Sequence, residues 1–297
     1  MPTTQTHYRT CNLCEAMCGI EIKYQNTTIL SIKGDKKDPF SKGYICPKAT
    51  ALQDIYEDPD RLKKPIKKVD GKWVEITWEE AYNFAADGIN KVREKYGNDA
   101  VAAYQGNPTA HNIGSMLFVG ELLRTLKTNN KYSASSVDQL PQQLAAQWMF
   151  GHIFAIPIPD INRTDYFLVI GANPVVSNGS LMTAGGMPNR IKELKSRGGK
   201  MVVVDPRKTK TAETADRHIF IKPGKDVFFL AALIHTFFEK QLIDINKLPD
   251  WVSGKEELRA MFVRFSPEKA AAECGVSKEI IEQVAREFSS SKTAVCY

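Results

Sequence analysis

Four cysteines near the start of the chain have the type and the spacing of ligands to a metal cluster. Cys11, Cys14 and Cys18 lie within eight residues of one another. Cys46 follows after twenty-seven intervening residues and stands directly before Pro47, which stiffens the backbone and has no N–H group to satisfy. A cubane iron–sulfur cluster takes one thiolate on each of its four irons. Three ligands from one short loop and a fourth from a separate segment therefore predict a [4Fe–4S] cluster.

The same cysteines allow two other interpretations. Four-cysteine zinc sites usually consist of two C-x2-C pairs, and this chain has no second pair around Cys46. Disulfides are typical of short secreted proteins, whereas this chain has 297 residues and shows no secretory signal. A zinc-stabilised binding module therefore stays the alternative. Cys274 and Cys296 have no cysteine near them in the sequence, and we expect them to be buried core thiols.

A second group of candidate residues follows apolar segments in the later part of the chain. Ligands of open α/β sheets bind at the carboxyl ends of the strands. A glycine there lets a phosphate approach the main chain, while amide and carboxylate groups bind ribose hydroxyls or a base edge. The sequence has no G-x-G-x-x-G motif, so a plain NAD site is disfavoured. We call the residues that follow each apolar segment a strand tip. The candidates are Gly171 and Asn173 on the first tip, Asp205 on the second, and Gly224 and Asp226 on the third. Asp226 could instead cap the next helix.

The elements that position the cysteines form a small β-rich segment. Residues 19–24 and 28–32 alternate apolar and polar side chains and are separated by Gln25 and Asn26, which predicts a hairpin. The polar loop 35–43 then delivers Cys46. We predict a cluster domain over residues 1–57, followed by a linker that contains Pro59 and Pro65.

From there the pattern alternates between helices and strands. An unbroken apolar strand such as 166–170 is typical of the interior of a parallel sheet. The predicted class is α/β, with the cluster domain followed by a doubly wound, mostly parallel αβα domain over 58–297. The predicted helices are 77–96, 113–126, 188–197, 227–240 and 278–289, and the predicted strands are 100–104 (short and buried), 166–170, 200–204 and 293–296.

Composition excludes several classes of function. Apolar residues make up 43% of the chain and charged residues 25%, as in ordinary soluble globular proteins. The net charge of +6 is mild, and the lysines between Lys33 and Lys68 are interleaved with few aromatics. We interpret them as a solvated face, or as a docking surface for an acidic redox partner, and not as a nucleic-acid site. No apolar run approaches the roughly 20 residues of a membrane span, and the expected location is cytoplasmic.

The motifs, in this order, resemble the molybdopterin oxidoreductase superfamily, which includes formate dehydrogenases, nitrate reductases and dimethyl sulfoxide reductases. C-x2-C-x3-C-x27-C, L-V-I-G-A-N-P, V-V-V-D-P-R-K-T and K-P-G-K-D follow one another along the chain, and A-D-R-H-I-F-I-K-P-G-K-D is characteristic of the family. The resemblance covers the whole chain. It implies a [4Fe–4S] cluster and a molybdenum or tungsten bis-(molybdopterin guanine dinucleotide) cofactor.

The resemblance also implies roles for particular residues. Lys48 matches a basic residue between the cluster and the pterin, although a lysine at such a position can also be a solvated surface residue. Gln105 and Gly106 match a loop beside the metal centre. The cluster would be held by Cys11, Cys14, Cys18 and Cys46, and one guanine dinucleotide by Gly171, Asn173, Pro174, Asp205, Arg207, Gly224 and Asp226.

The chain departs from the family pattern where a protein ligand to the metal is usual. Our alignment places Gln142, Gln143 or Leu144 there, and no cysteine is nearby. Ser136 or Asp138 would serve only after a shift of register, and some members use an oxo or hydroxo group instead of a protein ligand. His152 is a candidate proton carrier beside the metal, or a packed or surface histidine. The catalytic residues are therefore not assigned.

The function that the resemblance implies is two-electron oxidation or reduction of a small substrate, with formate as the leading candidate. Electrons would pass through the cluster to a redox partner protein or an iron–sulfur subunit. Family catalytic subunits are more than twice this long, and the last predicted strand has no turn after it, so we expect an N-terminal fragment that is inactive alone. The alternative is an electron-transfer or structural subunit that keeps the fold without the metal cofactor, but Gly171, Asp205 and Asp226 argue against it.

Overall fold

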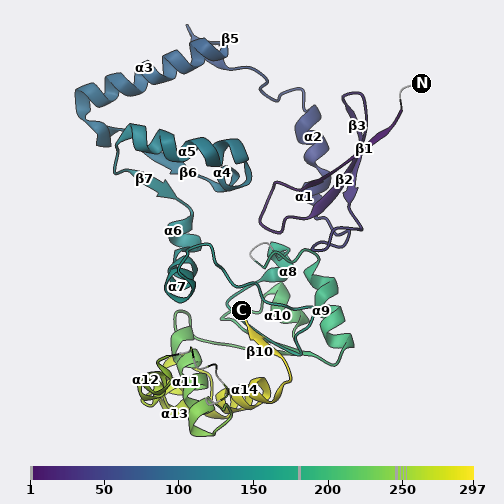
Figure 1. Cartoon of the computed structure of the whole chain (residues 1–297), viewed down its shortest axis with the longest axis vertical. Helices are drawn as coiled ribbons and strands as arrows, with labels where there is room; N and C mark the ends of the chain where they lie inside the picture. The colour runs from purple at the N-terminus through teal and green to yellow at the C-terminus, as the bar shows by residue number, and fades with distance from the viewer. Residues whose placement is uncertain (1–2, 180–181, 245–246, 248, 250, 252) are drawn as a thin grey trace. The chain divides into compact units, whose positions relative to one another are not determined.

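The chain divides into two compact units, Met1–Pro157 and Ile158–Tyr297, each of which is described by itself. The computed structural model describes residues 3–179, 182–244, 247, 249, 251 and 253–297 (Figure 1). The mixed α/β class that the sequence predicts is confirmed. The predicted domain boundary between residues 57 and 58 stays a prediction. Within the described residues, no helix combines the length and the apolar character that crossing a bilayer requires.

The first unit begins with a three-stranded antiparallel sheet and two short helices, which we call the cysteine module (residues 5–57). The predicted hairpin is confirmed, and Asn26 takes the left-handed conformation in its turn, with φ of 55°. The first strand of the sheet was not predicted, because all six of its residues are exposed and show no alternation. The elements are β1 (Gln5–Thr10), β2 (Gly19–Gln25), β3 (Thr28–Gly34), α1 (Pro47–Thr50) and α2 (Leu52–Glu57), with sheet order β1-β2-β3.

The rest of the first unit contains a second hairpin and several helices. Asp70 and Gly71 form the hairpin turn with φ of 47° and 81°, a signal for a two-residue turn that the sequence prediction did not use. Thr77 caps the long helix by accepting from the Glu80 main-chain N–H, as predicted. The elements are β4 (Ile66–Val69), β5 (Lys72–Glu75), α3 (Trp78–Tyr96), η1 (Asn98–Ala100), β6 (Ala103–Gln105), α4 (Asn107–His111), α5 (Ile113–Leu126), β7 (Lys131–Ser133), α6 (Ser135–Asp138) and α7 (Leu140–Phe150).

Apolar side chains in this second part of the unit are widely exposed. The expected buried strand over residues 100–104 is wrong, because β6 covers only Ala103–Gln105 and Tyr104 is 73% exposed. In the described part of the chain β6 pairs only with β7. Phe118 on α5 and Trp148 on α7 are 71% and 80% exposed. Among the described residues of these two helices, the buried side chains are Leu126 on α5 and Gln143 and Ala146 on α7.

The second unit is built on a fully parallel sheet with the order β10-β9-β8-β11. Strands β8 and β9 are confirmed at the predicted residues, because continuous apolar runs buried on both faces are easily recognised. The short strand β10 was missed, since it contains an arginine and a histidine among three residues. The strands are β8 (Tyr166–Ile170), β9 (Lys200–Val204), β10 (Arg217–Ile219) and β11 (Ala294–Cys296).

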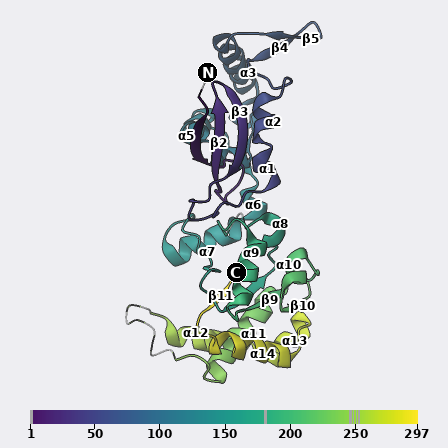
Figure 2. The ribbon, with the colours of Figure 1, turned by 90° about the vertical axis from the view of Figure 1, so that its right-hand side faces the viewer.

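Helices cover both faces of this sheet. Alternate side chains of each strand point to opposite faces, so Leu168 and Val202 belong to one core and Phe167 and Val203 to the other. Figure 2 shows α9 on one side of the sheet and α11, α13 and α14 on the other. The helices are α8 (Pro174–Ser177), α9 (Met187–Ser196), α10 (Lys210–Thr214), α11 (Asp226–Glu239), α12 (Lys255–Phe262), α13 (Pro267–Cys274) and α14 (Lys278–Ser290).

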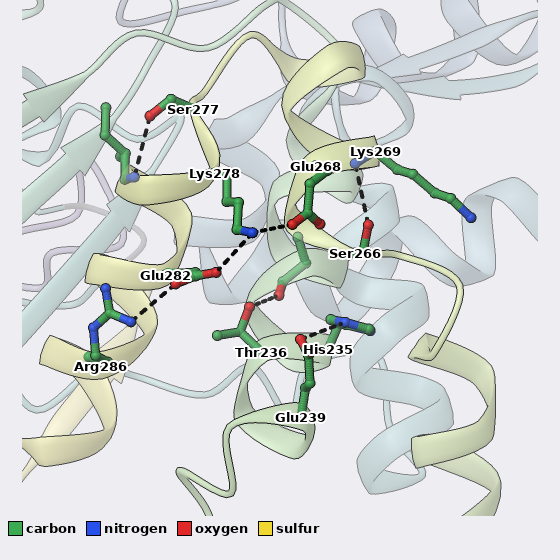
Figure 3. A network of polar contacts seen from close by, with 12 residues as sticks. His235, Thr236, Glu239, Ser266, Glu268, Lys269, Ser277, Lys278, Glu282 and Arg286 are labelled. Atoms are coloured by element: carbon green, nitrogen blue, oxygen red, sulfur yellow. Dashed lines mark hydrogen bonds and ion pairs between the residues drawn. The ribbon is translucent and has the colours of Figure 1, made fainter.

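Polar contacts cap and connect helices on the face of the sheet that α11, α13 and α14 cover (Figure 3). Ser266 and Ser277 cap α13 and α14 by accepting from main-chain N–H groups. Lys278 forms an ion pair with Glu268, which joins the start of α14 to the start of α13. Cys274 is buried in this core as expected, whereas Cys296 is exposed on the edge strand β11, so the prediction of a buried thiol is wrong there.

Candidate functional site

The four cysteines of the predicted cluster site lie in the loop between β1 and β2 and directly before α1. The Cys11 main-chain N–H donates to the Cys18 carbonyl at 2.8 Å, which closes the loop that carries the first three cysteines. Cys46 is the residue before the first turn of α1, where Pro47 takes the first helical position. Cys11 and Cys18 are buried, Cys14 and Cys46 are half-buried, and all four are free thiols. The loop carries three of the four thiols and the start of α1 carries the fourth, and their role as cluster ligands stays a prediction.

These thiols influence one another electrostatically. Burial, followed by the other three cysteines, raises the pKa of the Cys18 thiol to about 11. Burial also raises the pKa of Cys11, with smaller contributions in the same direction from Cys14 and Cys46. Grouped thiolates disfavour one another, and a bound cation removes that penalty because metal ligation requires the deprotonated sulfur. The site is therefore suited to cationic metal and not to free thiolates.

The number of these thiols fits a cubane cluster, which takes one external thiolate on each of its four irons. Among the residues that the structure describes, no group of three or more His, Cys, Asp or Glu side chains has the geometry of a metal site.

The loop over residues 35–43 is fitted tightly against the hairpin and so determines where Cys46 emerges. The Ser41 hydroxyl donates to Asp38 at 2.8 Å and accepts from the Gly19 main-chain N–H at 3.1 Å. A Cβ on Gly19 would stand 2.5 Å from Asp38, and one on Gly34 would stand 2.0 Å from the Gly43 carbonyl. Burial would raise the pKa of Asp38, but hydrogen bonds from Ser41 and its neighbours outweigh it and lower that pKa. Asp38 and Ser41 were not found from the sequence, although an acid followed by a serine in a Pro-containing loop is a turn signal.

The second site is a pocket of about 400 Å³ at the carboxyl end of the parallel sheet. It lies where β8 and β9 end, and the loop before α11 completes it. All three predicted strand tips contribute to the pocket. The carboxyl ends of the strands are where open α/β sheets bind their ligands. Pro174 is placed differently, since it begins α8 and is buried. The lining residues are Gly171, Asn173, Asp205, Pro206, Arg207, Thr209, Pro223, Gly224 and Asp226.

Two glycines leave the walls of this pocket open. Gly171 and Gly224 have φ of 65° and 71°, in the left-handed region that favours glycine. Apart from the glycine itself and its two chain neighbours, no heavy atom of the described residues lies within 4 Å of the place where a Cβ would stand on either of them. The main chain is thus exposed to the pocket at both positions, and a phosphate group can approach it closely.

The acidic residues of the pocket are held in different ways. Asp205 is 7% exposed, and its Oδ1 accepts from the Arg207 main-chain N–H at 2.7 Å. The ring of His218 contacts the Asp205 carbonyl oxygen through Nε2 at 3.0 Å, a support that sequence reasoning missed. Lys225 stands at the N-cap of α11 and Asp226 is the first residue of the helix, so Asp226 is not the cap. Both carboxylates can therefore accept from sugar hydroxyls or from a base edge.

The other predicted residues belong to the first unit. Lys48 is exposed on α1, Gln105 is the last residue of β6, and Gly106 is the N-cap of α4. Gln143 is buried in α7, where its amide donates to Gln139 at 3.5 Å. His152 is exposed, and its Nδ1 accepts from the Phe154 main-chain N–H at 3.2 Å. The roles of these residues at a metal centre stay predictions.

Gathered thiols and a pocket at strand ends are the features of a redox protein with both an iron–sulfur cluster and a nucleotide-bearing cofactor. The model of the molybdopterin oxidoreductase Fe4S4 domain matches residues 4–58, and that of the molybdopterin oxidoreductase matches residues 61–272. The chain therefore belongs to the molybdopterin oxidoreductase family. These matches confirm the predicted [4Fe–4S] cluster and molybdenum or tungsten molybdopterin cofactor.

Several curated proteins are similar over nearly the whole chain. The F420-dependent formate dehydrogenase subunit alpha of Methanocaldococcus jannaschii is 26% identical over 96% of this chain and 41% of its own length. The thiosulfate reductase molybdopterin-containing subunit PhsA of Salmonella typhimurium is 29% identical over 94% and 36%. Formate dehydrogenase H of Escherichia coli is 28% identical over 96% and 40%. The chain thus spans about two fifths of the length of these relatives.

A solved structure shows the same fold. Acetylene hydratase from Pelobacter acetylenicus matches with a TM-score of 0.79 and 24% identity, over 97% of this chain and 39% of that one. This likeness concerns the arrangement of the chain and carries no statement about the reaction.

Proposed function

We propose that this chain is the cluster-binding and dinucleotide-binding part of a molybdenum or tungsten oxidoreductase that moves two electrons to or from a small substrate. The observation that carries the proposal is the pocket at the carboxyl end of the parallel sheet, because all three predicted strand tips line it. The same chain groups four free thiols in a module that matches a cluster domain. A nucleotide site and a one-electron carrier in one chain are the two parts that such an enzyme needs.

In this proposal the residues of the pocket bind and orient one guanine dinucleotide. The open main chain at Gly171 and Gly224 receives phosphate oxygens, and Asp205 accepts from ribose hydroxyls. Asp226 accepts from the donor edge of the base. When bound, the metal cofactor supplies the two-electron chemistry and the protein supplies binding, orientation and insulation. Arg207 lies in the same pocket wall and adds positive charge near the phosphates.

The cysteine module holds the one-electron carrier. Cys11, Cys14, Cys18 and Cys46 would each bind one iron of the cluster, and the buried surroundings of Cys11 and Cys18 would tune its potential. Lys48 follows the last ligand by two residues and would hydrogen-bond the pterin. Electrons would leave toward a redox partner protein or an iron–sulfur subunit.

Formate is the substrate that we favour. Relatives named formate dehydrogenase support it, but others are named thiosulfate reductase and nitrate reductase. The residue that usually distinguishes these reactions is the protein ligand to the metal, and the corresponding segment here contains Gln142, Gln143 and Leu144. An enzyme without a Cys, Ser or Asp ligand at this position is therefore part of the proposal.

The test is the metal and cofactor content of the anaerobically purified chain. We expect about four irons per chain, a reduced-state EPR signal of a cubane cluster, and guanine-dinucleotide pterin in the extract. Zinc without iron would overturn the oxidoreductase proposal in favour of a structural metal module. Iron without any pterin, in protein made by cells that synthesise the cofactor, would favour an electron-transfer subunit that keeps only the fold.

A further inference from the structure

Thr211 joins two of the loops that form the pocket, although it does not line the pocket itself. It is completely buried in α10. Its hydroxyl donates to Oδ1 of Asn173 at 2.7 Å and accepts from the Val175 main-chain N–H at 3.1 Å. Its own main-chain N–H also donates to Oδ1 of Asn173, at 3.3 Å. Three hydrogen bonds therefore connect α10, which follows β9, with the start of α8, which follows β8.

These bonds determine which way the amide of Asn173 faces. A main-chain N–H can only donate, so the Asn173 atom that receives the Thr211 N–H must be the oxygen. The Val175 N–H likewise obliges the Thr211 hydroxyl oxygen to accept, which directs the hydroxyl hydrogen to Asn173. With its oxygen held against α10, Asn173 presents its NH2 group on the other side of the amide. Asn173 is one of the residues that line the pocket.

We propose that Thr211 is a positioning residue, which fixes the Asn173 side chain so that its NH2 group donates to an acceptor oxygen of the bound nucleotide. The inference rests on the proposed function, since it assumes that the pocket receives a guanine nucleotide. The acceptor is an oxygen of the phosphates, or one of the sugar or base. Thr211 would act only through Asn173 and would not touch the ligand.

A second threonine in the same unit provides a matched control. Thr236 is also completely buried, and its hydroxyl donates to the Ala232 carbonyl at 2.7 Å within α11 (Figure 3). Valine is β-branched like threonine but has no hydroxyl, so replacing either threonine by valine removes the hydrogen-bonding group. Only Thr211 makes a contact with a pocket residue through that hydroxyl. A purely structural role would make the two substitutions equivalent.

The experiment measures the binding of GDP to the full chain by isothermal titration calorimetry, together with its melting temperature. We expect Thr211→Val to weaken GDP binding about three- to tenfold, the effect of one hydrogen bond. Thr211→Ser should restore binding, and Thr236→Val should leave it unchanged even if its melting temperature falls as far. Guanosine identifies the acceptor: a smaller loss for guanosine than for GDP indicates a phosphate oxygen, and an equal loss indicates the sugar or base.

A double-mutant cycle tests whether Thr211 acts through Asn173. Asn173→Ala should weaken GDP binding by itself, and adding Thr211→Val should weaken it no further. Wild-type affinity in Thr211→Val, or losses that add fully in the double variant, would overturn the inference while leaving the proposed function in place. If the wild-type chain binds no GDP, it is the assignment of the pocket in the proposed function that fails. The two failures are therefore distinguishable.

Discussion

The cysteine module and the parallel-sheet unit both present groups that can bind a cofactor, but they relate those groups to their hydrophobic cores in opposite ways. In the module, Cys11 and Cys18 are themselves part of a small core with residues such as Ile20 and Ile32. In the sheet unit, the cores on the two faces consist of strand and helix residues such as Phe167 and Phe229. The pocket lies outside these cores, at the carboxyl ends of the strands. We therefore expect ligand binding and folding to be coupled in the first region and separable in the second.

The largest expected effect is the loss of the cluster from the cysteine module. Cys18→Ser should reduce iron from about four per chain to less than one, because a cubane cluster needs all four thiolates. Since metal ligation contributes to folding, amide hydrogen exchange should accelerate across residues 5–57 and stay unchanged in the sheet unit.

Cys274→Ser is the matched control for this substitution, because Cys274 is also a buried free thiol but lies in the sheet unit. It should keep the iron and accelerate exchange only near α13. Retention of the cluster in Cys18→Ser would contradict the coupling between ligand and core.

Next in size is a cavity in the core of the sheet unit. Phe229 is completely buried between α11 and the sheet, and Phe229→Ala should lower the free energy of unfolding of this unit by about 3–5 kcal/mol. Hydrogen exchange read by mass spectrometry measures this unit separately from the module. The iron content should not change, and its loss would show that the two regions depend on each other.

A smaller effect is expected from the carboxylate at the pocket. Asp205→Asn keeps the shape of the side chain and the bond from Arg207, but removes the charge that strengthens hydrogen bonds to a sugar. GDP binding should weaken about 10- to 100-fold, the equivalent of about 1.5–3 kcal/mol. Calorimetry on the full chain gives the dissociation constant.

Asp216 supplies the control for Asp205. It also accepts from a main-chain N–H, that of Met201 at 2.8 Å, but it lies before β10 at the opposite end of the sheet. Asp216→Asn should therefore leave GDP binding as it is and change only stability. Equal losses of GDP binding in both variants would contradict the prediction that the Asp205 carboxylate contacts the nucleotide.

The smallest effect concerns pH and the amino end of the sheet. Burial would raise the pKa of Glu287, but bonds from Lys200, Gln283 and Tyr166 outweigh it and hold that pKa below its ordinary value. A lowered folded-state pKa stabilises the fold above the unfolded pKa of about 4.3, and this stabilisation disappears as pH falls through the folded-state value. Melting temperatures between neutral and acidic pH should show the decline.

Glu287→Gln should flatten that decline, because an amide does not titrate, and should lower the melting temperature slightly at neutral pH. GDP affinity should stay unchanged at neutral pH, since Glu287 on α14 contacts the other end of the sheet from the pocket. An acid decline of the same steepness in the variant would show that other carboxylates govern it.

Local chemistry made part of this structure predictable from the sequence. Strands β8 and β9 were predicted at their observed residues because a run such as Val202–Val204 is apolar on both faces. Helix α3 was predicted because Thr77 supplies a cap and Gly97 a stop. The spacing of the cysteines and the order of the strand tips likewise allowed the family to be recognised from the sequence. Metal ligation and the close approach of a phosphate both require particular residue types.

Tertiary packing decided the rest. Strand β1 has no pattern of its own and exists by pairing with β2, and β11 joins the sheet beside β8 although more than 120 residues separate them in the chain. The prediction of a buried β6 was wrong because burial depends on which layers are present and not on the strand itself. The contact between Thr211 and Asn173 spans 38 positions and leaves no local pattern. The sequence alone determined which residue types could bind a cluster and a nucleotide, whereas only the folded chain decided which of them meet, because hydrogen bonds and burial join residues that are distant in sequence.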